Sequence, residues 1–168
     1  MPAAVAHTIT GLFLGERLRN KFFSKYSQFF VLVCGIAGLF PDIDIAVYFV
    51  LRLFIKDLPF QIVHRGFTHT IFFPLIFLAA ALVALALKKE KPFVLFYMIS
   101  VGTLSHVVLD FVLTQRIALF YPLSDVTNGI GLVPDTQFGR TIVMSIDAVL
   151  LTLWIVYLYW KGHIKKFF

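Results

Sequence analysis

The apolar residues of this 168-residue chain fall in five long blocks, and the polar residues gather between them. The blocks are 3–15, 29–55, 71–87, 93–113 and 142–160. Crossing a hydrocarbon core of about 30 Å takes roughly 20 helical residues, and the last four blocks are long enough or nearly so. Backbone groups in lipid must be hydrogen-bonded within the chain, so helices are expected here rather than open strands. The pattern predicts an all-α integral membrane helical bundle of about five apolar segments, forming one domain over residues 1–168.

The first two blocks depart from a simple membrane span. The first is short, and no Lys or Arg precedes it, so it lacks the basic start of a secretory signal peptide. We interpret it either as a short span or as a helix packed partway into the bilayer. In the second block, Pro41 interrupts the apolar run and is followed by Asp42 and Asp44. A proline inside a helix kinks or breaks it, so a broken helix is expected at this point.

The composition supports a membrane protein. The chain is 60% hydrophobic and 14% charged, whereas soluble domains are nearer half apolar and about a quarter charged. This excludes a disordered chain, and it argues against a soluble enzyme. The single cysteine, Cys34, excludes an internal disulfide. The net charge of +6 would suit a nucleic-acid binder, but the cations lie at the ends of apolar blocks, so we expect no nucleic-acid partner.

The positive charges predict an orientation in the membrane. Ten of the fifteen Lys and Arg lie in the stretches 16–25, 88–91 and 161–166, which alternate with less basic connections. Connections rich in Lys and Arg stay in the cytoplasm. We therefore place these stretches and the C-terminus in the cytoplasm. The N-terminus and the connections 56–70 and 114–139 are expected outside.

Several ionisable residues lie inside or beside the apolar blocks. They are Asp42, Asp44, Asp110 and Asp147, accompanied by His7 and His106. An Asp at the centre of a membrane helix costs about 2.5–3.5 kcal/mol on the insertion scale, so such residues mark functional sites by default. Arg65 is the one cation near these motifs, and a single cation cannot neutralise four carboxylates. A divalent metal can, and zinc or a similar borderline metal takes His and Asp ligands.

The spacing of these residues leaves alternatives open. His106 and Asp110 are four residues apart in a helical segment, so they share one face and can hold one ion. They could equally form a hydrogen-bonded pair within the bundle. Asp42 or Asp44 could be a ligand or could cap the second half of its broken helix, and one Asp could do each.

The segment 64–70, His-Arg-Gly-Phe-Thr-His-Thr, carries a more specific signal. His64 and His69 are five residues apart with Gly66 between them, so they do not share a helical face but can converge from a loop. Arg65 suits an anionic oxygen, because its fork matches phosphate geometry. The alternative is an interfacial loop whose arginine reaches lipid phosphates. His163, in the Lys-rich tail, is interpreted as a solvated bystander.

The expected depth of the candidates in the bilayer argues for one shared site. With the topology above, His106 lies about 20 Å up a core roughly 30 Å thick. The others fall in the same outer slab: His7, Asp42, Asp44, His64, His69, Asp110 and Asp147. Scattered polar residues would not be expected to agree in depth.

The ordered motifs resemble those of a known family. They are His7, Pro41-Asp42-Ile43-Asp44, His64-Arg65-Gly66 with Thr68-His69-Thr70, and Ser105-His106 with Leu109-Asp110. The set resembles the membrane-bound metal-dependent hydrolases that include DNA-damage-induced, LexA-regulated bacterial inner-membrane proteins. The resemblance covers residues 1 to about 123. The pattern is also distantly similar to the all-helical zinc-dependent phospholipase C and single-strand nuclease superfamily.

The resemblance implies a set of metal ligands. By position they are His7, one Asp of the pair Asp42 and Asp44, His64 or His69, His106 and Asp110. Asp110 is the residue best placed to bridge two ions. A later His, His and Glu set of the superfamily has no counterpart here, so one or two ions are expected, with zinc foremost.

These observations lead to a hypothesis about function. We expect a membrane-embedded metal-dependent hydrolase of a phosphoester such as a phospholipid headgroup, with membrane lipid as its partner. Asp44, or Asp42 if Asp44 is a ligand, would be the general base, and Arg65 would stabilise charge on the phosphoryl group. The alternatives are a metal or ion transporter or channel that uses the same cluster, and a scaffold with a structural metal. The sequence does not indicate an oligomeric state.

Overall fold

The computed structural model describes residues 4–113, 117–134 and 136–162. Its elements are α1 (Ala4–Phe22), α2 (Phe29–Ala37), α3 (Ile43–Arg52), α4 (Phe60–Val63), the 3-10 helix η1 (Phe67–His69), α5 (Phe72–Ala86), α6 (Glu90–Leu113) and α7 (Gln137–Trp160). Among these described residues there is no strand, only one isolated bridge between Ile117 and Asn128. The prediction of an all-α protein is confirmed.

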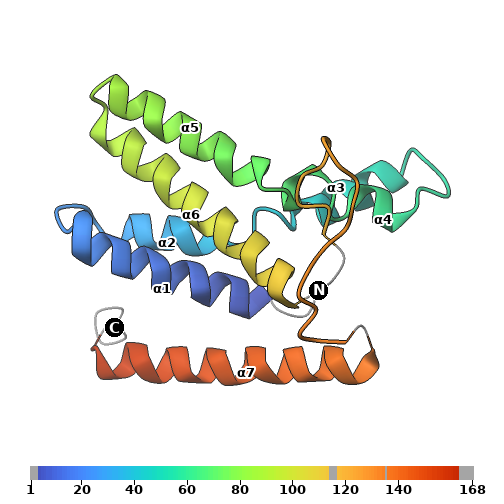
Figure 1. Cartoon of the computed structure of the whole chain (residues 1–168). Coiled ribbons are helices and arrows are strands. Elements are labelled where there is room, and N and C mark those ends of the chain that lie inside the picture. The colour runs from blue at the N-terminus through green and yellow to red at the C-terminus, as the bar shows by residue number, and fades with distance from the viewer. Residues whose placement is uncertain (1–3, 114–116, 135, 163–168) are drawn as a thin grey trace.

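Helix α6 is the centre of the bundle. It packs against α5, α2 and α1, and α7 packs against α1 (Figure 1). Val94 and Met98 of α6 are buried against Cys34 of α2 and form the core of this packing. Cys34 is a buried free thiol.

Two glycines allow α1 and α6 to approach α2 closely. A Cβ atom built at Gly11 of α1 would lie 2.6 Å from the carbonyl oxygen of Cys34, and one at Gly102 of α6 would lie 2.3 Å from the same oxygen. Any larger side chain at either position would force the helices apart. Small residues at crossing points are typical of helix packing in membranes, where close van der Waals contact stabilises the association.

The expectation of about five similar apolar segments is only partly met. Among the described helices, α6 and α7, with 24 residues each, are long and apolar enough to cross a membrane. Helix α5 has 15 residues, a length of about 22 Å. The second apolar block forms two short helices, α2 and α3, because the chain breaks at residues 38–42 around Pro41. The broken helix predicted from Pro41 is therefore confirmed, and a single span over 29–55 is not formed.

The helix directions place the described parts of the basic stretches, 16–25, 88–91 and 161–162, at one end of the molecule. The Ala6 N–H donates to Asp147 over 3.0 Å, and the Tyr157 hydroxyl lies 2.8 Å from a carboxylate oxygen of Glu16. These two contacts show that α1 and α7 run parallel. Lys25, after α1, pairs with Glu90 at the start of α6. The C-terminal ends of α1 and α7 and the α5–α6 connection therefore lie together, on the left of Figure 1.

The connection 117–134 is attached to the opposite end. The Ile71 N–H, just before α5, donates to the Leu119 carbonyl over 3.0 Å. Three N–H groups of the connection donate to the last carbonyls of α6: Ile130 to Phe111, Leu132 to Val112 and Val133 to Leu113. The last carbonyls of a helix have no partner within it, so these bonds complete the end of α6 and fix the connection beside it.

Candidate metal centre

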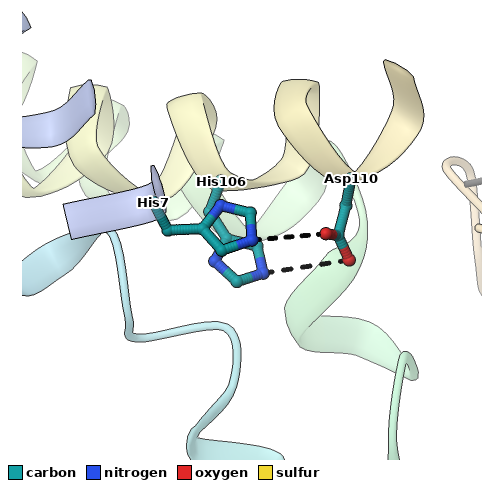
Figure 2. A group of neighbouring side chains, drawn as sticks. All are labelled: His7, His106 and Asp110. Atoms are coloured by element: carbon teal, nitrogen blue, oxygen red, sulfur yellow. Dashed lines mark ion pairs between the residues drawn. The ribbon is translucent and has the colours of Figure 1, made fainter. Parts of the chain in front are cut away.

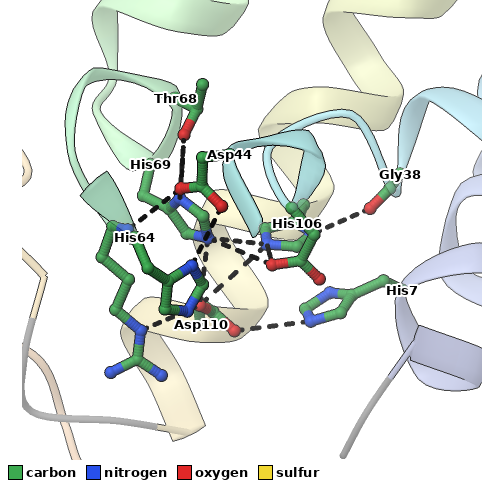
Figure 3. A network of polar contacts seen from close by, with 10 residues as sticks. His7, Gly38, Asp44, His64, Thr68, His69, His106 and Asp110 are labelled. Carbon is green, nitrogen blue, oxygen red and sulfur yellow. Dashed lines mark hydrogen bonds and ion pairs between the residues drawn. The ribbon is translucent and has the colours of Figure 1, made fainter. Parts of the chain in front are cut away.

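Separate elements bring the predicted ligands to one end of the bundle. His7 comes from α1, Asp42 and Asp44 from the break before α3 and from its first turn, and His64 and His69 from the segment between α3 and α5 (Figure 3). His106 and Asp110 come from α6. His7, His69 and His106 are all 0% exposed. The structure brings these residues together in three overlapping groups whose ligand atoms lie within 4.8 Å of one another, at the end of the bundle opposite the α5–α6 connection.

The two motif residues of α6 meet the histidine of α1. The rings of His7 and His106 stack with centroids 3.8 Å apart. Nε2 of His7 lies 3.4 Å from Oδ1 of Asp110, and Nε2 of His106 lies 4.0 Å from Oδ2 of the same residue (Figure 2). Asp110 therefore presents one oxygen to each imidazole, an arrangement suited to a carboxylate shared between two sites.

The hydrogen bonds of His106 fix which ring nitrogen is available. Nδ1 lies 2.7 Å from the carbonyl oxygen of Gly38, in the break that follows α2. A carbonyl only accepts, so Nδ1 carries the hydrogen and donates it. In the neutral ring, Nε2 then has a lone pair and faces the cluster. In metal sites, a ligating histidine regularly donates its other ring N–H to a carbonyl or carboxylate oxygen, which fixes its tautomer.

The ring nitrogen of His69 that carries the hydrogen can be assigned in the same way. The Thr68 hydroxyl donates its one hydrogen to Oδ2 of Asp44 over 3.0 Å. Nδ1 of His69 lies 3.1 Å from that hydroxyl oxygen and 3.3 Å from Oδ2 of Asp44. Both neighbours can only accept, so Nδ1 carries the hydrogen. Nε2 of the neutral His69 ring therefore also has a lone pair.

The two Nε2 atoms face each other. Nε2 of His69 and Nε2 of His106 are 3.3 Å apart, and at this distance either a proton on one nitrogen or a metal ion between the two must offset the repulsion of their lone pairs. Asp42 Oδ1 lies 3.5 Å from the first nitrogen and 3.8 Å from the second, and Asp110 Oδ2 lies 3.8 and 4.0 Å from them. Tetrahedral zinc with bonds of about 2.0–2.2 Å has ligand atoms about 3.3–3.6 Å apart. The donor set therefore fits a metal ion with small adjustments.

Unpaired polar atoms support the same interpretation. Among the described residues, buried atoms without a hydrogen-bond partner include Nε2 of His7, Oδ1 of Asp42 and Oδ2 of Asp110. Buried polar groups in proteins are almost always paired, so each exception requires an explanation. Here the unpaired atoms are nitrogen and oxygen atoms that can ligate a metal ion and that face the cluster. A bound cation would give each of them a partner.

Asp44 has a different place from Asp42. Its Oδ1 accepts from Nδ1 of His64 over 2.9 Å, and its Oδ2 accepts from the Arg65 N–H and the Thr68 hydroxyl, each over 3.0 Å. Both oxygens thus already accept hydrogen bonds. Asp44 is therefore better suited to orienting His64 and His69 than to acting as a general base. Asp42 occupies the N-cap position of α3 but makes no side-chain capping hydrogen bond. The capping alternative is therefore wrong for Asp42, whose Oδ1 faces the two imidazoles instead.

His64 and Arg65 line the outer side of the cluster. With Nδ1 of His64 donating to Asp44, its Nε2 has a lone pair, and this atom is buried without a partner among the described residues. Arg65 has a positive φ of 65°, a conformation that costs a non-glycine residue about 1–3 kcal/mol. The hydrogen bond from the Arg65 backbone N–H to Asp44 stabilises this conformation. Nε of Arg65 lies 3.9 Å from Oδ2 of Asp110, and the side chain is 24% exposed.

Asp147 lies beside the residue that precedes His7. It accepts from the Ala6 N–H, so it holds the first turn of the helix that carries His7. His163 lies outside the described residues. The sequence interpretation also missed two groups that support the cluster, the Thr68 hydroxyl and the Gly38 carbonyl. Every residue has a backbone carbonyl, so the sequence does not indicate which one supports a site. The Thr68 hydroxyl, in contrast, could have been predicted from its place in the motif.

The charge of His69 gives the site a predictable pH dependence. Burial lowers the pKa of His69, but the carboxylates of Asp42, Asp44 and Asp110 outweigh this and raise its pKa to about 9. In the metal-free protein, His69 therefore holds a proton at pH 7 that a metal must displace. Zinc affinity should rise about tenfold per pH unit from pH 7 to about 9. Zinc titrations against a competing chelator at several pH values would measure this, and an affinity that does not change with pH would contradict it.

The fold and the cluster together define a class of protein. In the part of the chain that the structure describes, the protein is all-helical, with two helices long and apolar enough to cross a membrane and a buried His/Asp group that could hold a metal ion. The chain belongs to the family described as YdjM inner membrane protein, whose family model matches residues 1–167. No curated protein and no solved structure matches it.

Proposed function

We propose that this membrane protein is a metal-dependent hydrolase that acts on the phosphoester of a membrane lipid. The observation that carries the proposal is the pair of Nε2 atoms of His69 and His106, 3.3 Å apart with both Nδ1 hydrogens already donated. Together with the unpaired oxygens of Asp42 and Asp110, they form a donor set for a borderline divalent ion such as zinc.

The proposed ligands fall into two groups around Asp110. Asp42, His69 and His106, with Oδ2 of Asp110, would hold the first ion. His7 and Oδ1 of Asp110 offer donors for a second ion. A bound metal ion of this kind acts as a Lewis acid and supplies an activated water at neutral pH.

The remaining polar residues suggest roles for the protein itself. His64 and Asp44 form a pair in which the carboxylate holds Nδ1–H and leaves Nε2 free, as a general base requires. We therefore assign proton abstraction to His64 and orientation to Asp44, in place of the general-base role expected for Asp44. The guanidinium of Arg65, whose Nε lies 3.9 Å from Oδ2 of Asp110, would pair with an anionic oxygen of the substrate.

The surroundings of the site favour a lipid over a soluble phosphoester. The connections at this end expose large apolar side chains: Leu53 is 80% exposed, Phe54 81% and Leu123 80%. Loop residues of this kind are unusual at an aqueous surface, whereas they suit the boundary between headgroups and acyl chains. Lys56 follows Phe54 by two residues in the sequence and would meet lipid phosphates there. The site would then open at headgroup level, on the side we assign to the exterior.

Ion transport is less well supported by the same structure. The buried hydroxyl groups of α6 below the cluster are those of Ser100, Thr103 and Ser105. Each donates to a backbone carbonyl: Ser100 to Pro74, Thr103 to Ile99 and Ser105 to Gly102. Their hydrogens are therefore already bonded, and they do not extend the cluster into a polar path along the helix.

Replacing Arg65 tests the proposed chemistry without removing a ligand. In the zinc-loaded protein, Arg65→Gln should lower kcat/KM for hydrolysis of phospholipid in mixed micelles by about 100-fold or more, because an electrostatic contact in the transition state is lost. Metal content should not change. The released headgroup would be quantified by mass spectrometry, with Arg52→Gln, an exposed arginine in the last turn of α3, as the matched control. If fully loaded protein cleaves neither lipid nor soluble phosphoesters, the hydrolase proposal is wrong.

A further inference from the structure

A second polar site lies far from the metal centre, between the C-terminal halves of α1 and α7. The two helices line a half-open pocket of about 600 Å³. Phe13, Arg17 and Lys21 line it from α1, and Tyr157 and Lys161 line it from α7 and the residue after it. It lies at the end of the molecule where the basic stretches gather (Figure 1).

The pocket is positively charged. Arg17, Lys21 and Lys161 contribute three cations, and Glu16 contributes the one carboxylate among the lining residues. Both oxygens of Glu16 lie within hydrogen-bond distance of the Tyr157 hydroxyl, at 2.9 and 2.8 Å. This bond connects α7 to α1, and the lining keeps a net charge of +2, from three cations and one carboxylate, that can attract an anion.

The pocket lies where an apolar helix surface meets polar residues. Helix α7 presents its apolar side chains outward over most of its length, since only 6% of its apolar window is buried. At its C-terminal end it exposes Tyr159 and Trp160, directly before Lys161. Tyr and Trp followed by cations are typical of the boundary between acyl chains and headgroups. A ligand in the pocket would therefore have its charged part among cations and its apolar part along α7.

We propose that this pocket binds the headgroup of an anionic phospholipid. Its phosphate would contact Arg17, Lys21 and Lys161, and its acyl chains would lie along the exposed faces of α7 and Phe13. Basic pockets between membrane helices bind anionic headgroups by this combination of charge and apolar contact. A free phosphate would use the cations but not the apolar surface. The site shares no residue with the metal centre, so the proposal is independent of the hydrolase proposal.

Lipid retention by the full-length protein tests this site. The protein would be incorporated into lipid nanodiscs that contain phosphatidylglycerol and phosphatidylcholine, then extracted gently and weighed by native mass spectrometry. We expect retention of phosphatidylglycerol with at least a tenfold preference over phosphatidylcholine. The triple variant Arg17→Gln, Lys21→Gln, Lys161→Gln should lose that preference, with unchanged metal content.

The matched control removes the same charge from the same end of the molecule. Lys88, Lys89 and Lys91 are exposed in and after the α5–α6 connection, and their triple Gln variant should retain phosphatidylglycerol like the natural chain. An equal loss in this control would show that net charge alone attracts the lipid, and the site would be rejected. Equal retention of both lipids, or full displacement by inorganic phosphate, would also overturn the proposal. If the pocket triple variant does not fold, the exposed Lys161→Gln alone should weaken retention, and no change there would reject the site.

Discussion

The Asp110→Asn protein should fold and lose its metal. Asp110 presents Oδ1 to His7 at 3.4 Å and Oδ2 to His69 at 3.8 Å, so the change removes a negative charge from the centre of the donor set. Losing even an outer partner of a ligand costs about 10–100-fold in metal affinity, and loss of this charged ligand should cost at least about 100-fold. Zinc affinity would be measured by competition with a chelator, in detergent, for the natural and the variant protein.

The control for this experiment is Asp57→Asn. Asp57 is exposed in the connection between α3 and α4 and has a positive φ of 63°, which asparagine also tolerates. The charge change is the same and lies on the same side of the protein. Zinc affinity should not change in this variant. An Asp110→Asn protein that binds zinc as tightly as the natural chain would show that the ion does not lie where we place it.

The second large effect is expected from Asp44→Asn, as a loss of stability. The carboxylate accepts hydrogen bonds from the His64 ring, the Arg65 N–H and the Thr68 hydroxyl. An amide presents an NH₂ group where one oxygen was, so at least one buried donor would face another donor. The loss of bonds to a buried carboxylate should destabilise the protein by about 3 kcal/mol or more. Thermal unfolding in detergent would measure this.

Hydrogen exchange locates the effect of Asp44→Asn. The backbone N–H groups of residues 64–70 should lose protection first, because Asp44 holds Arg65 in its left-handed conformation. Helices α5 and α6 should retain their protection at temperatures below unfolding. A variant as stable as the natural chain, with unchanged exchange at 64–70, would contradict the orienting role of Asp44.

The gathering of ligands could be predicted from the sequence because depth in a membrane is a simple coordinate. The apolar blocks and the basic stretches predict where each residue lies along the bilayer normal, and this prediction gives His7, Asp42, His106 and Asp110 the same depth. In a small helical bundle, residues at the same depth that face the interior are expected to lie close to one another. The structure places the ligand atoms of His7, His106 and Asp110 within 4.8 Å of one another, and those of Asp42, His69 and His106 likewise.

The helix boundaries were less predictable from hydropathy. Helix α1 continues to Phe22 through the charged stretch after the first apolar block, because Glu, Arg and Lys are good helix formers. An apolar block marks the part of a helix that contacts lipid or core, and the helix itself can be longer. The break at Pro41, by contrast, has a direct cause in the sequence and was predicted.

The division of roles between Asp42 and Asp44 could not be read from the sequence. It depends on the conformation of Arg65, whose positive φ directs its N–H to Asp44. The neighbouring Gly66 would be the usual candidate for such a conformation, and its φ is −74°. Which carboxylate is occupied by hydrogen bonds therefore follows from the loop geometry and not from the residue types.

The central claim is that the His/Asp cluster holds a metal ion. The most direct test is elemental analysis of the full chain purified in detergent without chelators, combined with X-ray absorption at the edge of the metal found. We predict one or two zinc ions per chain, bound by nitrogen and oxygen ligands at about 2.0–2.2 Å, and their loss in His106→Ala. A folded protein without stoichiometric metal, even after zinc, manganese and other divalent ions are offered, would contradict the account.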